Sequence, residues 1–299
     1  MTYFVYSDKY FLEWPGHVFP VEKYRLLHAK LQSEGIITKK NLLEPKSATD
    51  GDILLVHTKR YLDHVKDITD DPMLALMEFE VPVSASIVEA FYYAAGGTIL
   101  ASRIAIEKNT AVMNLGGGFH HAFGDHGEGF CLINDLAVAI RVMQKENLIK
   151  KALVVDLDLH QGNGTAHIFL NDPDIFTFSM HQENNYPIKQ KSSLDIGLKD
   201  FIADDEYLKA LEWNLPRIIK NHKPDLILYQ AGADPFEGDL LGTLRLTKEG
   251  LKKRDEIVIK NAHKSHIPIA VTLGGGYAPN INDVVDIHFQ TAKAVLAYK

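Results

Sequence analysis

The strongest restriction on the fold comes from an alternation between short apolar runs and longer amphipathic segments. The runs have the length of strands and are rich in valine and isoleucine, which is typical of strands buried on both faces of a parallel sheet. They span Tyr3–Ser7, Ile53–His57, Ala111–Leu115, Ala152–Asp158, Ile175–Met180, Leu226–Gln230 and Ile269–Leu273. Helical patterns span Val21–Ser33, Val83–Lys108, Asn134–Asn147, Asp205–His222, Lys248–His263 and Asp283–Tyr298.

This alternation predicts an α/β protein with three layers, in which helices cover both faces of an open, mostly parallel sheet. A closed barrel of the same elements is the alternative, and the uneven strand lengths favour the open sheet. Proline and glycine do not gather into a linker, so we expect one domain over residues 1–299. Asp204 or Asp205 is the expected N-cap of the fourth helix, and Pro216 should kink it or end it early.

Charge, cysteine content and hydropathy exclude several functional classes. The net charge is −7, so direct binding to nucleic acid is not expected. A single cysteine rules out an intramolecular disulfide. The N-terminus lacks the pattern of a signal peptide, and the longest apolar stretch, at 90–102, is too short for a membrane span. We expect an intracellular, cytoplasmic location, or the nucleus if the source is eukaryotic, and the oligomeric state stays open.

Chemistry-bearing side chains follow four of the predicted strands. Each of these strands runs into glycines accompanied by histidine, aspartate or tyrosine, in the segments Gly116–His121, Leu159–Gly164, Ala231–Asp234 and Gly274–Tyr277. Ligands of open α/β sheets bind outside the carboxyl ends of the strands. Ordinary turns would explain the glycines but not the recurrence of titratable groups. The sequence therefore predicts an active site at this edge.

Asp156, Asp158 and His160 alternate along one strand and should share a face. Two neighbouring carboxylates in a buried strand are costly unless they are paired or bind a metal. Asp158, His160 and Asp234 would give three ligands and leave a coordination position open for water, as in catalytic zinc sites. A carboxylate–histidine network without metal is the alternative, and iron or cobalt could use similar ligands.

The remaining polar groups suit amide hydrolysis. Asp156 would accept a hydrogen bond from a histidine ring and fix its tautomer. His121 could take a proton from metal-activated water and later deliver it to a leaving amine. The Tyr277 phenol could donate to a carbonyl oxygen as negative charge develops on it.

Taken together, these motifs resemble the zinc-dependent histone deacetylase family, which has the arginase–deacetylase fold. The matching segments are Gly116–His121, Gly129–Asp135, Asp156–Gly164, Ala231–Asp239 and Gly274–Tyr277. The segments His160–Gly164, Glu237–Asp239 and Lys252–Glu256 are most similar to the class IV branch and its bacterial relatives.

The resemblance implies one zinc ion on Asp158, His160 and Asp234, with His121 as general base and acid. It further implies that His120 is the histidine linked to Asp156 and that Tyr277 polarises the acyl carbonyl. The residues implied to contact substrate are Gly129, through its carbonyl, together with Phe130, Leu241 and Gly275. A potassium ion is implied at Asp156 and Asp158 with the main chain of His160 and with Ser179 and Met180.

One residue departs from the pattern of many family members. Asn163 stands where they have an aspartate beside the second histidine. An amide stabilises an imidazolium less than a carboxylate does, so His121 should be less basic here. This predicts a different acid limb in the pH–rate profile.

The predicted function is a zinc-dependent amidohydrolase that removes an acetyl or longer acyl group from the ε-amine of lysine in proteins. Alternatives are a deacetylase of acetylpolyamines or other small amides, a dimanganese ureohydrolase, and a non-catalytic acyl-lysine-binding scaffold. No Asp-x-Asp pair occurs at Asp234, which favours one metal, and none of the catalytic residues is missing, which argues against a scaffold. The loop Trp14–Pro20 is either a rim of the substrate tunnel or a plain surface loop.

Overall fold

The computed structural model describes residues 2–298, and within them one open sheet of eight parallel strands organises the chain. The strand order is β2-β1-β3-β8-β7-β4-β5-β6, and every neighbouring pair is parallel. The strands are β1 (Tyr3–Val5), β2 (Leu42–Leu43), β3 (Ala111–Asn114), β4 (Ala152–Asp156), β5 (Ile175–Gln182), β6 (Leu194–Leu198), β7 (Leu226–Gln230) and β8 (Ile269–Thr272). Strands β2 and β6 end the sheet without pairing to each other, so the sheet does not close into a barrel.

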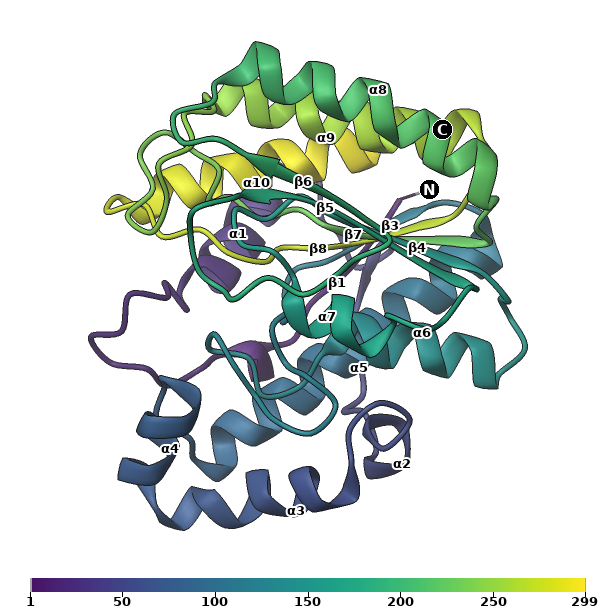
Figure 1. Cartoon of the computed structure of the whole chain (residues 1–299). Helices are drawn as coiled ribbons and strands as arrows, with labels where there is room; N and C mark the ends of the chain where they lie inside the picture. Colours follow the sequence, from purple (N-terminus) through teal and green to yellow (C-terminus); the bar gives the residue numbers. More distant parts are fainter. Residues whose placement is uncertain (1, 299) are drawn as a thin grey trace.

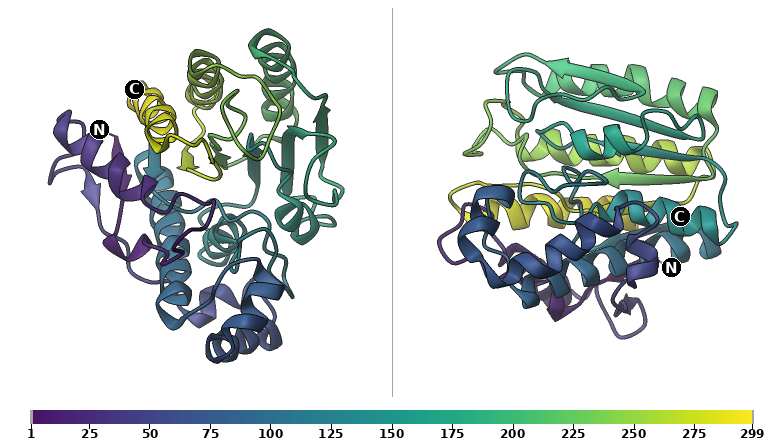
Figure 2. Two further views of the ribbon diagram at one scale, coloured as in Figure 1. Left: turned by 90° about the vertical axis from the view of Figure 1, so that its left-hand side faces the viewer. Right: turned by 60° about the horizontal axis from the view of Figure 1, so that its bottom comes forward.

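Helices cover both faces of this sheet, which confirms the three-layer prediction. Figure 1 shows α1, α10, α9 and α8 side by side over one face and α5, α6 and α7 over the other. The two further views in Figure 2 show the same layering, with α2, α3 and α4 lying beyond α5. The helices are α1 (Lys23–Ser33), α2 (Asp50–Ile53), α3 (Lys59–Asp67), α4 (Pro72–Phe79), α5 (Ala85–Lys108), α6 (Asp135–Lys145), α7 (Asn163–Ile168), α8 (Asp204–His222), α9 (Lys248–Lys264) and α10 (Ile281–Leu296), with short 3-10 turns at Asp8–Tyr10 and Ile68–Asp70.

The central strands are apolar because both of their faces are covered. All residues of β3, β4, β7 and β8 are buried. Their register places Val155 beside Tyr229, and Tyr229 beside Val271, across three neighbouring strands. Burial on both sides explains why these runs form continuous apolar segments in the sequence.

One predicted strand is wrong. The run Ile53–His57 begins at the end of the short helix α2 and continues through turns. Thr49 and Asp52 form a capping box, in which each side chain accepts a hydrogen bond from the other's backbone N–H. This local capping satisfies the first backbone donors of a helix and outweighs the strand preference of the apolar residues that follow.

Two details of the predicted helix α8 also need correction. Ala203 is its N-cap, while the Asp204 carboxylate accepts from the backbone N–H of Thr247 (2.9 Å) and from its hydroxyl (2.6 Å) at the start of α9. Of the two outcomes predicted at Pro216, the early end is wrong, because the helix continues to His222. Proline removes one helical hydrogen bond, and the buried residues Leu215 and Ile219 on either side keep the helix packed.

Candidate active site

Four strand ends meet at one place because β3, β8, β7 and β4 are consecutive in the sheet. Hydrogen bonds join the segments that follow them. The Gly274 N–H donates to the Gly117 carbonyl (3.3 Å), and the Ala233 N–H donates to the Gly275 carbonyl (2.9 Å). The side chains predicted at these positions therefore lie together at the carboxyl edge of the sheet.

Strand β4 ends at Asp156, two residues before the predicted end, because the backbone beyond it bonds to carboxylates. The Leu159 N–H donates to Asp234 Oδ1 (2.9 Å), and the His160 N–H donates to Asp158 Oδ1 (3.0 Å). These bonds take the backbone out of the pairing between strands and fix the carboxylates of Asp158 and Asp234. The Gly275 N–H, at 2.8 Å, holds the second oxygen of Asp158.

Asp158, His160 and Asp234 converge as a possible metal-binding group. All three are buried, and one ligand atom from each lies within 4.8 Å of the other two. His160 Nδ1 is 3.1 Å from Asp234 Oδ2 and 3.3 Å from Asp158 Oδ1. A Cβ on residue 275 would collide with Asp234 Oδ2, so only glycine leaves room for this arrangement.

The electrostatics of the group fit a bound cation. Burial and the charge of Asp158 raise the pKa of Asp234 to about 7. Burial alone would lower the pKa of His160, but hydrogen bonds and charges from the two aspartates raise it to about 10. A positive charge is thus favoured between these carboxylates, and two carboxylates with one imidazole are a donor set that zinc accepts.

Two adjacent histidines have different partners and opposite electrostatics. His120 Nδ1 lies 2.7 Å from Asp156 Oδ2, and although burial opposes it, the charges of Asp156 and Asp158 raise the pKa of His120 to about 9. His121 Nδ1 lies 2.7 Å from the amide oxygen of Asn163. Burial, reinforced by the charges on His120 and His160, holds the pKa of His121 well below its usual range. His121 is therefore neutral and can accept a proton.

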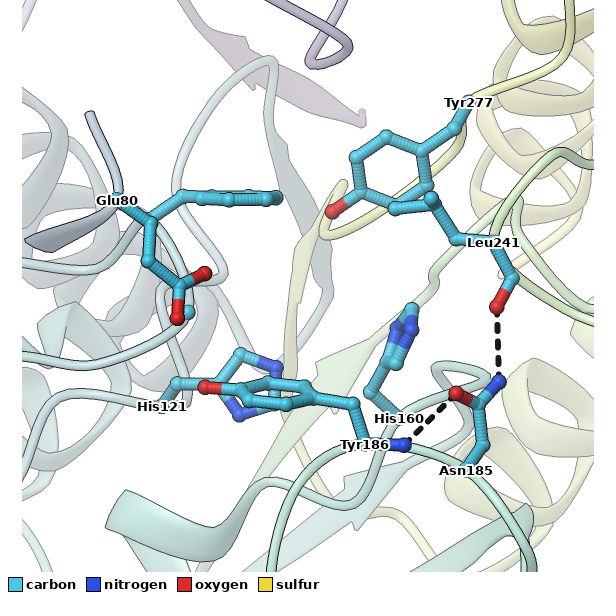
Figure 3. A pocket seen from close by; sticks show the side chains of 9 residues that line it. Glu80, His121, His160, Asn185, Tyr186, Leu241 and Tyr277 are labelled. Atoms are coloured by element: carbon cyan, nitrogen blue, oxygen red, sulfur yellow. Dashed lines mark hydrogen bonds between the residues drawn. The ribbon is translucent and has the colours of Figure 1, made fainter.

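Tyr277 is held over the group by its backbone. Its N–H donates to Asp239 Oδ2 (2.7 Å), and the other oxygen of Asp239 accepts from the Leu241 N–H (2.9 Å). Burial and the charge of Asp234 raise the pKa of Tyr277 above its usual range, so the hydroxyl keeps its proton. In Figure 3 this hydroxyl points into the cavity, where it can donate a hydrogen bond.

A cavity of about 210 Å³ opens over His160 (Figure 3). It is lined by His121, Gly129, Phe130, His160, Leu241 and Tyr277 and by Glu80, Asn185 and Tyr186, three residues that the sequence analysis missed. Asn185 and Tyr186 follow strand β5, so the strand-end argument applied to β5 would have found them. Glu80 follows helix α4 with a φ of +62°, and no sequence pattern points to it.

The other predicted site residues lie at the same strand ends or pack against the metal-binding group. Gly275 packs against the carboxylates beneath it. Asp156 and Ser179 are register partners on β4 and β5, which places Met180 beside the same strand end. The rim loop contacts the cavity residues, since the His17 ring lies 4.6 Å from the Phe130 ring and the Phe19 ring 6.0 Å from that of Tyr277.

Comparison with known proteins identifies the family. The profile described as "Histone deacetylase domain" matches residues 17–292. The chain belongs to the histone deacetylase family. This confirms the resemblance seen in the sequence, and it makes the protein a deacetylase, which is a hydrolase.

Three related proteins align with this chain over most of its length. It is 43% identical to an uncharacterized protein of Picosynechococcus, over 95% of each chain. It is 32% identical to Histone deacetylase 2 of Arabidopsis thaliana, covering 91% of this chain and 74% of the relative. It is 29% identical to the acetoin utilization protein AcuC of Bacillus subtilis, covering 91% and 76%.

The fold is also found in a solved structure. The HDA15 HD domain superposes with a TM-score of 0.85 at 23% identity, over 99% of this chain and 91% of that one. The likeness confirms the predicted arginase–deacetylase architecture. Among residues 2–298, no helix combines the length and the apolar character needed to cross a membrane.

Proposed function

We propose that the protein is a zinc-dependent lysine deacylase, similar to class IV enzymes, and that residues 1–299 form one catalytic domain. The observation that carries this proposal is the convergence of Asp158, His160 and Asp234 beneath a cavity that also receives His121 and Tyr277. A ligand group, a neutral base and a protonated phenol around one small cavity are the parts that amide hydrolysis requires.

Asp158, His160 and Asp234 would hold one zinc ion. When bound there, zinc supplies a Lewis acid that polarises a carbonyl and makes water a better nucleophile at neutral pH. Three protein ligands leave a position open for chemistry, which distinguishes a catalytic site from a closed structural one.

His121 would move the proton. Its Nδ1 is engaged by Asn163, so Nε2 is the nitrogen available to accept a proton from water. After the amide bond breaks, the same nitrogen would return the proton to the departing amine. His120, paired with Asp156, would place a positive charge beside the reacting group. Tyr277 would donate a hydrogen bond to the carbonyl oxygen as negative charge develops there.

The cavity is small and suits the side chain of a substrate rather than a bulky molecule. Its volume of about 210 Å³ is below the range of roughly 300–1,000 Å³ that is usual for small-molecule pockets. Phe130, Leu241 and Tyr186 supply walls suited to the methylenes of an acyl-lysine side chain, with an acetyl group or a longer acyl chain at the end. The Gly129 carbonyl would accept a hydrogen bond from the substrate amide N–H, and Gly275 would contact the substrate at the inner end of the cavity.

Two further assignments belong to this proposal. A potassium ion would bind at Asp156 and Asp158 with the main chain of His160 and with Ser179 and Met180. The single cysteine, Cys131, is buried and unpaired, which suits a reducing compartment, and we place the protein in the cytoplasm.

A substrate panel with metal analysis tests the proposal. The zinc-reconstituted protein would be offered lysine peptides carrying acetyl, butyryl, octanoyl and myristoyl groups, and acetylated polyamines in parallel. We expect release of acyl groups from the peptides, one zinc per chain, and loss of activity in His121→Ala. Faster hydrolysis of acetylpolyamines than of the peptides would identify a small polyamine, not a protein, as the substrate. The carboxylate of Glu80 on the cavity wall would favour binding of such a cation. Two manganese ions per chain, or no hydrolysis of any of these substrates, would overturn the proposal of a zinc-dependent deacylase.

A further inference from the structure

Glu128 lies directly behind the proposed proton-transfer group. It begins a tight turn in which the Glu128 N–H donates to the Cys131 carbonyl (3.2 Å) and the Cys131 N–H to the Glu128 carbonyl (2.9 Å). The turn also carries the tunnel residues Gly129 and Phe130, both with positive φ. The Glu128 side chain leaves this turn toward the start of helix α7, where it meets Asn163.

Three side chains form a line from the protein surface to the cavity. Asn163 Nδ2 donates to Glu128 Oε2 (2.9 Å), and Asn163 Oδ1 lies 2.7 Å from His121 Nδ1. Asn163 and His121 are buried, whereas Glu128 is half-buried. Among the described residues, these are the two hydrogen bonds made by the Asn163 side chain. These two bonds therefore fix which end of the amide faces His121.

The orientation of an amide decides what the next group can do. An amide presents an acceptor at one end and a donor at the other, whereas an ionised carboxylate only accepts. Glu128 can bond only to the NH₂ end, so the carbonyl end must face His121. His121 then carries its proton on Nδ1, and Nε2 keeps the lone pair that a general base needs. A flipped amide would place its NH₂ group against Nδ1 and favour the opposite tautomer.

We propose that Glu128 is a positioning residue for the hydrolysis described above, on which this inference rests. It holds the Asn163 amide in the orientation that keeps the Nδ1 proton on His121 and leaves Nε2 free to accept a proton. Its negative charge also polarises the amide toward His121, in part replacing the aspartate that many family members carry at position 163. Loss of the group that orients a metal-ligating histidine typically costs about 10- to 100-fold in affinity or activity. We expect a loss at the lower end of this range for a base that is oriented through one intervening amide.

The alternative is that the Glu128 hydrogen bond only stabilises the turn. Two substitutions separate these roles. Glu128→Leu removes both the acceptor and the charge, whereas Glu128→Gln keeps an acceptor and loses the charge. We expect kcat to fall about 10-fold for the leucine variant and less for the glutamine variant. Because the Glu128 carboxylate also faces the Tyr186 hydroxyl on the cavity wall, a change in KM reports the loss of that contact and the fall in kcat reports the effect on His121. Asp125→Leu is the matched control, because it removes an exposed carboxylate from the same loop outside the cavity.

A second substitution makes the test decisive. In an Asn163→Asp background the introduced carboxylate accepts directly from His121 Nδ1, so Glu128 is no longer needed. Adding Glu128→Leu to that background should then leave kcat unchanged or raise it, because it removes a like charge beside the introduced carboxylate. Equal losses in both backgrounds would show a purely structural role and overturn the inference.

The tautomer of His121 gives a readout that does not depend on turnover. Nitrogen-15 spectra of the imidazole, assigned by difference with His121→Gln, should show a protonated Nδ1 in the wild type and a mixture in Glu128→Leu. An unchanged spectrum together with unchanged kcat would refute the role of Glu128. If the wild type fails to hydrolyse any acyl-lysine peptide, the proposed function fails, and the imidazole spectra still decide whether Glu128 sets the tautomer.

Discussion

Removing the Arg254 side chain should strongly destabilise the fold. This side chain is fully buried on α9, where its guanidinium lies 2.8 Å from Asp255 and donates to the carbonyls of Leu157 (3.2 Å) and Gly232 (2.6 Å). Asp255 is also fully buried and accepts from the hydroxyls of Tyr229 (2.5 Å) and Thr291 (2.6 Å). Arg254→Met would leave this carboxylate without its cation and two carbonyls without donors.

The expected loss can be worked out from these contacts. Removing one partner of a buried ion pair costs about 3–5 kcal/mol, because the other charge stays buried and uncompensated. At roughly 2–4 °C per kcal/mol, which is the range for chains somewhat shorter than this one, Tm should fall by about 10 °C. Urea titration of the purified variant measures the free energy of unfolding directly.

Two further variants control for the loss of an arginine as such. Arg25→Met breaks an exposed pair with Glu22, whose side chains are 68% and 40% exposed, and should cost less than about 0.5 kcal/mol. Combining Arg254→Met with Asp255→Asn removes both charges and should recover part of the loss. A loss below about 1 kcal/mol for Arg254→Met, or a double variant less stable than the single one, would refute the reasoning.

Four other outcomes are expected. Asn163→Asp should raise the basicity of His121, so the acid limb of the kcat/KM profile should move to higher pH; an unmoved limb would count against the assigned base. Tyr277→Phe should lower kcat by roughly 10²- to 10³-fold, as the loss of an oxyanion donor does, with the fold intact by circular dichroism. Burial lowers the pKa of His57 to about 4, so the unfolded chain, with a pKa near 6.5, binds a proton that the folded chain does not. Stability should therefore fall by on the order of 3 kcal/mol between about pH 6.5 and 4, and His57→Gln should flatten that part of the curve in urea titrations. Chelation of the metal should lower Tm and abolish activity, and added zinc should restore both; a Tm unaffected by chelator would contradict binding at Asp158, His160 and Asp234.

Much of the fold and of the candidate site could be predicted because the signals are local. Strands buried on both faces need apolar side chains throughout, so β3, β4, β7 and β8 stand out from their flanks. Asp158 and His160 stand out for the opposite reason, since charged groups at the end of such a strand are costly without a partner. The rule that parallel strands carry ligands at their carboxyl ends then joins Asp234 and Tyr277 to the same place.

Other parts were not predicted, either because a neighbouring helix cap outweighed the apolar pattern or because the interacting residues lie far apart in the sequence. The run after Ile53 looked like a strand, but the capping of α2 by Thr49 decided its conformation. Glu80 reaches the cavity from a connection outside the regular elements. Glu128 acquires its role only through Asn163, which lies 35 residues further along the chain.

Two buried cations show how the fold tolerates the carboxylates of the site. Lys23, on α1, donates to the carbonyl of Gly274 (2.6 Å), and burial lowers its pKa to about 8. Arg254 donates to the carbonyls of Leu157 and Gly232 from α9 on the same face of the sheet. Each of the three loops that carry Asp158, Asp234 and Tyr277 is therefore held through a backbone carbonyl by a buried cation. Such bonds offset part of the negative charge of the site carboxylates and fix the loops before any ion binds. They leave no local pattern in the sequence, because Lys23 and Gly274 lie 251 residues apart.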